Sequence, residues 1–160
     1  MMSATTGTTG ETENWRDNLI QDSQRLTELL RGARRVAVLG MRTEEYSMRP
    51  AFYVPQALHA MGLEVIPVPV HHPDAETILG QKTYQRVADV PGRVDIVDVF
   101  RRAEDIEAHL EDILAARPKA VWFQSCIRND RAAERLARAG IKVVQDRCLM
   151  VEHRSLGRRR

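Results

Sequence analysis

Two arginines and a proline follow the first apolar run of the chain, and together they could bind an anion. Arg42 and Arg49 lie in the polar stretch after Gly40, and Pro50 follows Arg49 directly. Proline favours the first turn of a helix, whose free backbone N–H groups form an anion site that cationic side chains reinforce. These residues predict a phosphate-binding site; the alternative is that both arginines are solvated loop residues.

Histidine and cysteine side chains supply two further candidates, each with a simpler alternative. His71 and His72 precede Asp74 and could ligate a metal, but neighbouring histidines on a flexible segment rarely complete a site. Cys126 could act as a nucleophile, although the apolar run before it favours a buried, inert thiol. We therefore predict neither a metal site nor a catalytic cysteine.

A third candidate group lies near the C-terminal end. Asp146, Glu152 and His153 could form a hydrogen-bonded acid–base group. Because Arg147 and Arg154 are interleaved with them, ion pairs that hold the C-terminal segment in place are the interpretation we favour.

Five short runs rich in Val and Ile must position these side chains, and they recur at residues 35–40, 63–68, 94–100, 120–124 and 141–144. Such runs, alternating with amphipathic stretches, predict repeated βαβ units joined by right-handed crossovers. The expected fold is a Rossmann-like, doubly wound α/β fold with a parallel five-stranded sheet in the order 3-2-1-4-5 and helices on both faces. Ligands of such sheets bind at the carboxyl ends of the strands, where the strand order reverses.

The stretches between the strands carry the expected helices. Apolar spacing, prolines at helix starts and glycines at helix ends predict helices over 15–31, 50–61, 103–116 and 129–139. A short helical turn is expected over 75–79, and the segment 146–153 should fold back as a closing segment.

Length and composition indicate one globular domain. The 160 residues are 43% hydrophobic and carry a formal net charge of +2 without a basic stripe, so no nucleic-acid partner is expected. No apolar run approaches the roughly 18 residues of a membrane span. We expect a disordered tail over 1–13, a single domain over 14–156 and a basic tail over 157–160. The lack of signal-peptide features and the two cysteines favour the cytoplasm.

The usual dinucleotide fingerprint is absent from the chain. No second glycine follows Gly40 before Gly62, and the second run ends in Pro67-Val68-Pro69 where an acidic residue would bind a ribose. Binding of NAD or FAD in the usual mode is therefore disfavoured, whereas a phosphate ligand stays open.

Several segments resemble, in order, the bacterial single-domain CoA-binding proteins, which are related to the CoA-binding domain of the succinyl-CoA synthetase α subunit. The most specific are Val94-Asp-Ile-Val-Asp-Val-Phe-Arg101 and Asp146-Arg-Cys148, with the resemblance covering about residues 33–156. Weaker matches occur at 36–40, 49–50, 65–68, 78–84, 89–91, 120–124 and 152–153.

The resemblance implies a CoA site across the strand ends, with CoA or an acyl-CoA as the ligand. It assigns Gly40, Met41, Arg42, Arg49 and Pro50 to the diphosphate. It assigns Val68, Pro69 and Lys82 to the nucleotide or its 3′-phosphate, and Phe100 and Arg101 to the adenine and ribose.

The expected function is CoA binding without catalysis by the chain itself. One alternative is a small enzyme that acts on a nucleotide or an acyl-CoA thioester. Another is a protein-interaction module whose pocket has been lost. The protein partner, if one exists, is not predictable from the sequence.

Overall fold

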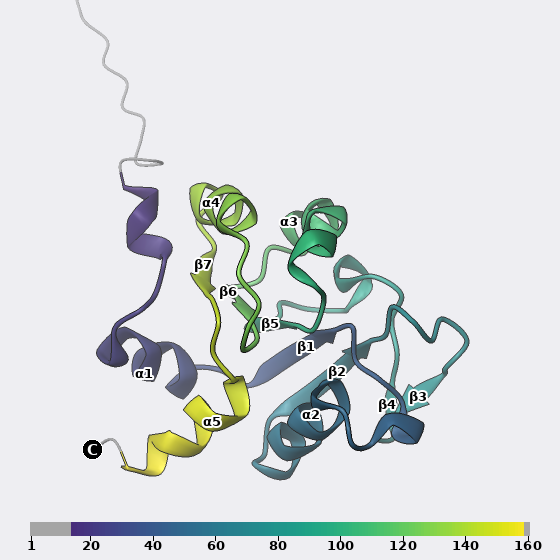
Figure 1. Ribbon diagram of the computed structural model, residues 1–160. Helices are drawn as coiled ribbons and strands as arrows, with labels where there is room; N and C mark the ends of the chain where they lie inside the picture. The colour runs from purple at the N-terminus through teal and green to yellow at the C-terminus, as the bar shows by residue number, and fades with distance from the viewer. Residues whose placement is uncertain (1–13, 159–160) are drawn as a thin grey trace, which may run out of the picture.

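A computed structural model describes residues 14–158, and its centre is a five-stranded parallel sheet (Figure 1). The strands are β1 (Arg35–Leu39), β2 (Glu64–Val68), β5 (Ile96–Val99), β6 (Ala120–Phe123) and β7 (Lys142–Val144). They lie in the order β2-β1-β5-β6-β7. The predicted fold class, a Rossmann-like parallel sheet with helices on both faces, is confirmed.

Helices cover the two faces of the sheet (Figure 1). The helices α3 (Leu110–Ala116) and α4 (Asp130–Arg138) lie on one face, where they pack against the buried side chains of Val97, Val99 and Phe123. The helices α1 (Ser23–Arg31), α2 (Pro50–Ala60) and α5 (Leu149–Arg154) cover the other face. Short 3-10 helices are η1 (Trp15–Asn18), η2 (Glu44–Tyr46), η3 (Val87–Asp89), η4 (Ala103–His109) and η5 (Ser155–Arg158).

The strand order corrects one part of the prediction. The run at 94–100 was expected at the outer edge of the sheet, but β5 lies between β1 and β6, so the five predicted runs have the order 2-1-3-4-5. The carboxylate of Asp95 accepts the N–H groups of Arg34 and Arg35 at 2.7 and 2.8 Å, which ties the start of β5 to the start of β1. The order therefore reverses between β1 and β5.

A hairpin occupies the flank of β2 in place of the predicted helical turn over 75–79. Its strands β3 (Thr77–Ile78) and β4 (Gln81–Lys82) are antiparallel, and Leu79 and Gly80 between them have φ values of 55° and 70°. Two consecutive positive φ values are typical of the tight turns that join β-hairpins, not of a helix end. Just beyond the hairpin, Tyr84 donates its N–H to the carbonyl of Pro67 on β2 at 3.0 Å.

The remaining helix predictions are confirmed in position but not always in extent. The helix predicted over 15–31 is divided into η1 and α1, because residues 19–20 extend along β7 and Asp22 caps α1 by accepting the N–H of Arg25. The helix predicted over 103–116 begins as η4 and continues as α3. The closing segment contains α5, and η5 includes the first half of the predicted basic tail.

Some predictions fall partly or wholly outside the described residues. The tail predicted over 1–13 and the last two residues, 159–160, belong to this group. Within residues 14–158, no helix has the length and apolarity needed to cross a bilayer.

One carboxyl group is buried in this sheet without a partner. Asp98 on β5 is 0% exposed, and neither of its carboxyl oxygens has a hydrogen-bond partner among the described residues. Its strand neighbours in register are Val38 and Trp122, both fully buried. Burial raises the pKa of the Asp98 carboxyl well above its ordinary value of 3.8, so the neutral acid is the form that this apolar environment favours.

We predict that Asp98→Asn changes the pH dependence of stability. A carboxyl whose pKa is raised on folding contributes stability below its unfolded pKa and loses it as the pH rises through the folded pKa. The free energy of unfolding of the Asn variant minus that of the parent should therefore grow above about pH 4, by up to about 1.4 kcal/mol per pH unit. Urea titrations at several pH values measure this difference, and parallel pH profiles would contradict it.

Candidate functional site

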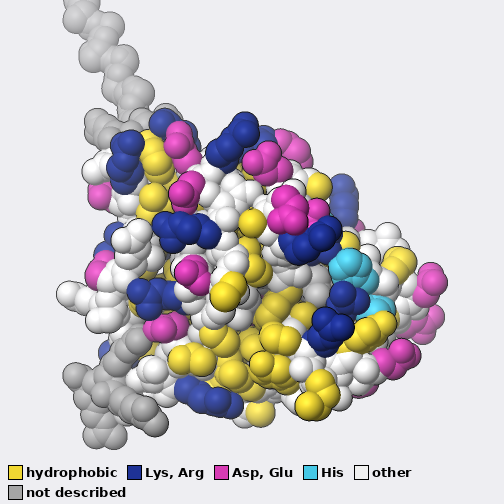
Figure 2. All heavy atoms as spheres, viewed as in Figure 1, with side chains coloured by type: hydrophobic (Ala, Val, Ile, Leu, Met, Phe, Trp, Pro, Cys, Tyr) yellow, Lys and Arg dark blue, Asp and Glu magenta, His cyan; other side chains and the backbone are white. Residues whose placement is uncertain are grey.

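A cavity of about 730 Å³ opens at the carboxyl ends of β1, β5 and β6, between the start of α2 and the α5 segment. This is the place where the strand order reverses, at which open α/β sheets bind ligands. Backbone and side chains from the loops after β1, β2, β5, β6 and β7 line it, so distant parts of the sequence meet here. Figure 2 shows hydrophobic side chains gathered between the positions of α2 and α5, with basic side chains and histidines beside them.

Gly40 lies where the ends of β1 and β5 come close together. It has φ +91°, and a Cβ atom built on it would lie 2.4 Å from the carbonyl oxygen of Phe100. Its N–H donates to the carbonyl of Val68, and the N–H of Phe100 donates to that of Leu39. A side chain at position 40 would push these strand ends apart, so glycine is required for the floor of the cavity to form.

Arginines approach the cavity from the loop after β1. Arg42 is half-buried, with its guanidinium 5.0 Å from the centre of the Tyr46 ring, and its N–H donates to the carbonyl of Ala51 in α2. Arg49 is exposed and stands at the N-cap position of α2, with Pro50 as the first helical residue. The Arg49 side chain makes no capping hydrogen bond to this helix. Its N-terminal dipole and the two arginines therefore make this side of the cavity positive.

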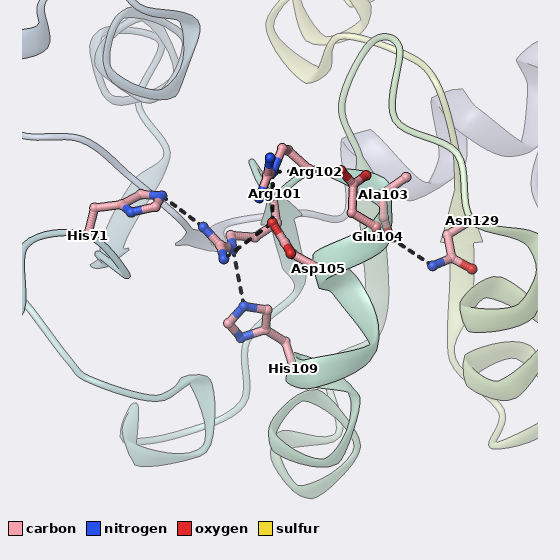
Figure 3. A network of polar contacts seen from close by, with 8 residues as sticks. All are labelled: His71, Arg101, Arg102, Ala103, Glu104, Asp105, His109 and Asn129. Atoms are coloured by element: carbon pink, nitrogen blue, oxygen red, sulfur yellow. Dashed lines mark hydrogen bonds and ion pairs between the residues drawn. The ribbon is translucent and has the colours of Figure 1, made fainter.

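Arg101, at the end of β5, is held by three side chains (Figure 3). Its Nη1 lies 2.8 Å from Nε2 of His71, and its Nε donates to Nε2 of His109 at 3.2 Å. Its Nη2 lies 3.7 Å from a carboxylate oxygen of Asp105. A guanidinium group can only donate hydrogen bonds, so both imidazoles accept and are neutral in this arrangement.

The electrostatics of the cavity agree with neutral imidazoles. Desolvation lowers the pKa of His71, and the nearby charges of Arg42 and Arg101 lower it further. Desolvation is also the main cause that lowers the pKa of His109, followed by Arg101. The two rings thus orient the Arg101 guanidinium without adding a charge of their own or cancelling its charge.

Arg102 is the next residue and is turned partly toward acids of its own segment. Its Nε lies 3.0 Å from Asp105 and 3.8 Å from Glu104, and its hydrogen bond is the main cause that lowers the pKa of the Asp105 carboxyl. Asn129 fixes this segment from the other side by donating to the carbonyl of Ala103 at 2.9 Å (Figure 3). The lining residues of the cavity include four arginines and one acid, Glu104.

The opposite side of the cavity is less polar and carries two thiols. Its lining residues come from the loop after β6 and from the α5 segment, namely Gln124, Ser125, Cys126, Ile127, Cys148, Met150 and Val151. Cys126 is exposed, so the expectation of a buried thiol is wrong. The chain leaves the buried strand β6 at Gln124, and a positive φ of 69° at Cys126 turns it out toward the cavity.

Six of the ten residues that the resemblance assigned to a ligand line this one cavity: Gly40, Arg42, Arg49, Pro50, Phe100 and Arg101. The other four do not line it. The side chain of Met41 is fully buried in the core, and Val68 and Pro69 are buried at the end of β2. Lys82 is exposed on β4, 5.3 Å from the ring of Tyr84, beside a separate cavity of about 140 Å³.

The acid–base group considered from the sequence does not converge on one point. Asp146 accepts the N–H of Cys126, whereas Glu152 pairs with Arg147 at 3.5 Å. The Nδ1 atom of His153 is buried without a partner among the described residues, and desolvation lowers the pKa of this ring. The Arg147–Glu152 pair supports the interpretation that these charges hold the C-terminal segment.

Sequence reasoning missed lining residues of two kinds. Tyr53 on α2 was not considered, and His71 after β2 was weighed only as a metal ligand, although its position at a strand end was a usable signal. Cys148, Met150 and Val151 come from a segment whose docking place depends on tertiary contacts, so no local pattern located them.

Fold and cavity define a Rossmann-like α/β protein with an arginine-lined cavity at the switch point of its sheet. Residues 34–154 match the CoA binding domain family, and the chain belongs to this family. This confirms the resemblance drawn from the sequence.

The chain is also similar to individual proteins along most of its length. The chain is 31% identical over 128 residues to the uncharacterized protein YneT of Bacillus subtilis (strain 168), covering 80% of this chain and 91% of YneT. It is similar to a solved structure from Thermus thermophilus, cell-free ID.343, with 41% identity and a TM-score of 0.79, covering 85% of this chain and 99% of that one.

A more distant likeness concerns the fold alone. Dinucleotide-forming acetyl-coenzyme A synthetase 1 of Ca. Korarchaeum cryptofilum has a TM-score of 0.58 at 20% identity, and the match covers 73% of this chain and 27% of that one.

We predict that Gly40→Ala lowers the free energy of unfolding by about 2 to 4 kcal/mol, because it combines a strained positive φ with overpacking against Phe100. Gly140→Ala is the matched control: its φ is +87°, but a Cβ there meets nothing within 4 Å, so only the backbone strain of about 1 to 2 kcal/mol remains. Chemical denaturation of both variants gives the difference. Equal losses of unfolding free energy in the two variants would show that the steric contact with Phe100 adds nothing to the backbone strain.

Proposed function

We propose that this chain is a cytosolic module that binds CoA or an acyl-CoA in the cavity at the ends of β1, β5 and β6. The observation that carries the proposal is the polarity of the cavity: the loops after β1 and β5 contribute arginines, whereas the segments after β6 and β7 contribute mainly apolar side chains and two cysteines. CoA has the same polarity, since a phosphorylated nucleotide is joined to a largely uncharged pantetheine arm that ends in a thiol. Membership of the CoA binding domain family supports this ligand.

The diphosphate of CoA is best accommodated beside Arg42 and Arg49. Both arginines flank the N-terminus of α2, where Pro50 has no N–H and the N–H of Phe52 donates to the carbonyl of Arg49. A phosphate there would meet the N–H of Ala51, the positive end of the helix dipole and the two guanidinium groups. Gly40 has no side chain, which leaves room for a ligand to approach the backbone between the strand ends.

The nucleotide end would lie toward Phe100 and Arg101. The His71 and His109 rings hold the Arg101 guanidinium in place, so little side-chain entropy would be lost when it contacts a ribose or phosphate oxygen. The exposed Arg102 extends the positive surface on the same side.

The pantetheine arm would then run toward the loop after β6 and the α5 segment. Met150, Val151 and Tyr53 offer apolar contact there, and Val151 and Tyr53 are 51% and 40% exposed. Covering these side chains with the arm removes apolar surface from water, which favours binding.

CoA should raise the melting temperature of the protein, because a ligand that binds the folded state alone stabilises it by mass action, by about 2.7 kcal/mol at a concentration of 100 Kd.

Arg49→Ala should weaken CoA binding by about 1.5 to 3 kcal/mol, the range for a hydrogen bond to a charged group. It should leave the melting temperature of the free protein nearly unchanged, since Arg49 is exposed. Thermal melts and isothermal titration measure the two quantities.

Arg93→Ala is the matched control for this experiment. Arg93 is also exposed but lies before β5, beside Arg117, and does not line the cavity. Its removal deletes the same charge and should change CoA affinity little. The absence of a thermal shift with millimolar CoA would refute the proposal and favour the interaction-module alternative. Equal losses of CoA affinity in the two variants would show that Arg49 does not contact the ligand.

A further inference from the structure

Both cysteines of the chain line the same cavity. Cys126 follows β6, and Cys148 stands at the N-cap position of α5, so residues 22 positions apart in sequence line one cavity. The sequence contains no other cysteine. A cavity with cationic side chains on one side and two thiols on the other suits a ligand that is itself an anionic thiol or disulfide.

Hydrogen bonds hold the two cysteine-bearing segments against each other. The N–H of Cys126 donates to the Asp146 carboxylate at 2.6 Å, and the buried side-chain oxygen of Gln124 accepts the N–H of Leu149 at 3.0 Å. Residue 146 is two positions before Cys148, and residue 149 is the next one after it. The segment around Cys126 is therefore hydrogen-bonded to residues on both sides of Cys148, namely Asp146 and Leu149.

The two thiols differ in access. Cys126 is exposed, whereas Cys148 is half-buried and packs against the core beneath α2 and α5. A ligand that enters the cavity therefore meets Cys126 first. This difference assigns the attacking role to Cys126 and the second, resolving role to Cys148.

We propose that this cavity is a thiol–disulfide exchange site for CoA disulfides, in which Cys126 captures one CoA as a mixed disulfide and Cys148 releases it. The proposal rests on the proposed function, since the arginine side of the cavity must hold the CoA nucleotide. It adds a reaction to the binding and supersedes the expectation of an inert Cys126, which assumed that the thiol was buried.

The exchange is balanced by the ligand and the two protein thiols alone. The Cys126 thiolate attacks one sulfur of the CoA disulfide, a protein–CoA disulfide bond forms, and the first CoA leaves as a thiolate with the electron pair. The Cys148 thiolate then attacks the Cys126 sulfur, and the second CoA leaves in the same way. The CoA disulfide gains two electrons, the protein dithiol loses two, and the protons lost by the cysteines balance those gained by the two CoA thiols.

The arginines should make the reaction selective for this disulfide. Arg42, Arg49 and Arg101 line the side of the cavity opposite the thiols and would bind the phosphates of the nucleotide. Glutathione disulfide carries no phosphate, so neither binding nor steering would bring it to Cys126 with the same frequency.

A single-turnover experiment with pre-reduced, full-length protein and CoA disulfide tests the proposal. The parent protein should release two equivalents of CoA thiol and form a Cys126–Cys148 disulfide, detected by intact-mass and peptide mass spectrometry. Cys148→Ser should release one equivalent and retain one CoA on Cys126; if this variant does not fold, Cys148→Ala takes its place. Cys126→Ser should react at least about tenfold more slowly than the parent, and so should the parent with glutathione disulfide.

Thermal melts with reduced CoA, run on the same preparations, separate the two proposals. If CoA raises the melting temperature while CoA disulfide leaves both thiols free, or reacts no faster than glutathione disulfide, the exchange site is refuted and CoA binding stands. An adduct that forms on Cys148 at the parent's rate in Cys126→Ser would also overturn the assignment. If CoA produces no thermal shift, the proposed function fails and the exchange site fails with it.

Discussion

The contact between Gly40 and Phe100 is the constraint on which the cavity depends. Parallel strands that reverse their order leave a crevice at one place only, and here the crevice lies between β1 and β5. The hypothetical Cβ of residue 40 would lie 2.4 Å from the Phe100 carbonyl oxygen, so the two strand ends can meet only when residue 40 has no side chain. This approach brings the loop with Arg42 and Arg49 and the residue Arg101 after β5 to the same cavity.

The positions of the strands were predictable from the sequence, whereas their order was not. The five apolar runs alternate with amphipathic stretches, and local hydrophobic patterns determine which residues can form buried strands. The order of the strands in the sheet depends on which strand edge each new strand can pair with. The contacts that decide this pairing join residues far apart in sequence. The Asp95 carboxylate binds the amides of Arg34 and Arg35, and the segment after the hairpin binds β2 through Tyr84. Neither contact can be recognised from the neighbouring sequence. Asp95, for example, looks like any other polar residue at the start of a strand.

The candidate site was predictable to a similar degree, and for the same reason. Residues that directly follow a strand or begin a helix, such as Gly40, Pro50 and Arg101, meet at one sheet edge in any parallel α/β fold, so a resemblance in sequence could assign them. Lys82 illustrates the limit, because the hairpin that carries it turns away from the crevice and along β2. His71 was weighed as a metal ligand, yet it accepts a hydrogen bond from Arg101, a pairing that no spacing in the sequence indicates.

The α5 segment, which carries Cys148, is held in place by contacts with β6 and not by the stability of its own helix. A helix of six residues such as α5 is too short to be stable alone, so tertiary contacts must place it. Trp122 donates its indole N–H to the carbonyl of Arg147 at 2.8 Å, and Gln124 accepts the N–H of Leu149, so two buried side chains at the end of β6 hold the α5 segment. Buried polar groups are costly to leave unpaired, which disfavours any movement of the segment that breaks both bonds. Cys148 lies between the two anchored residues, so its backbone is fixed relative to β6.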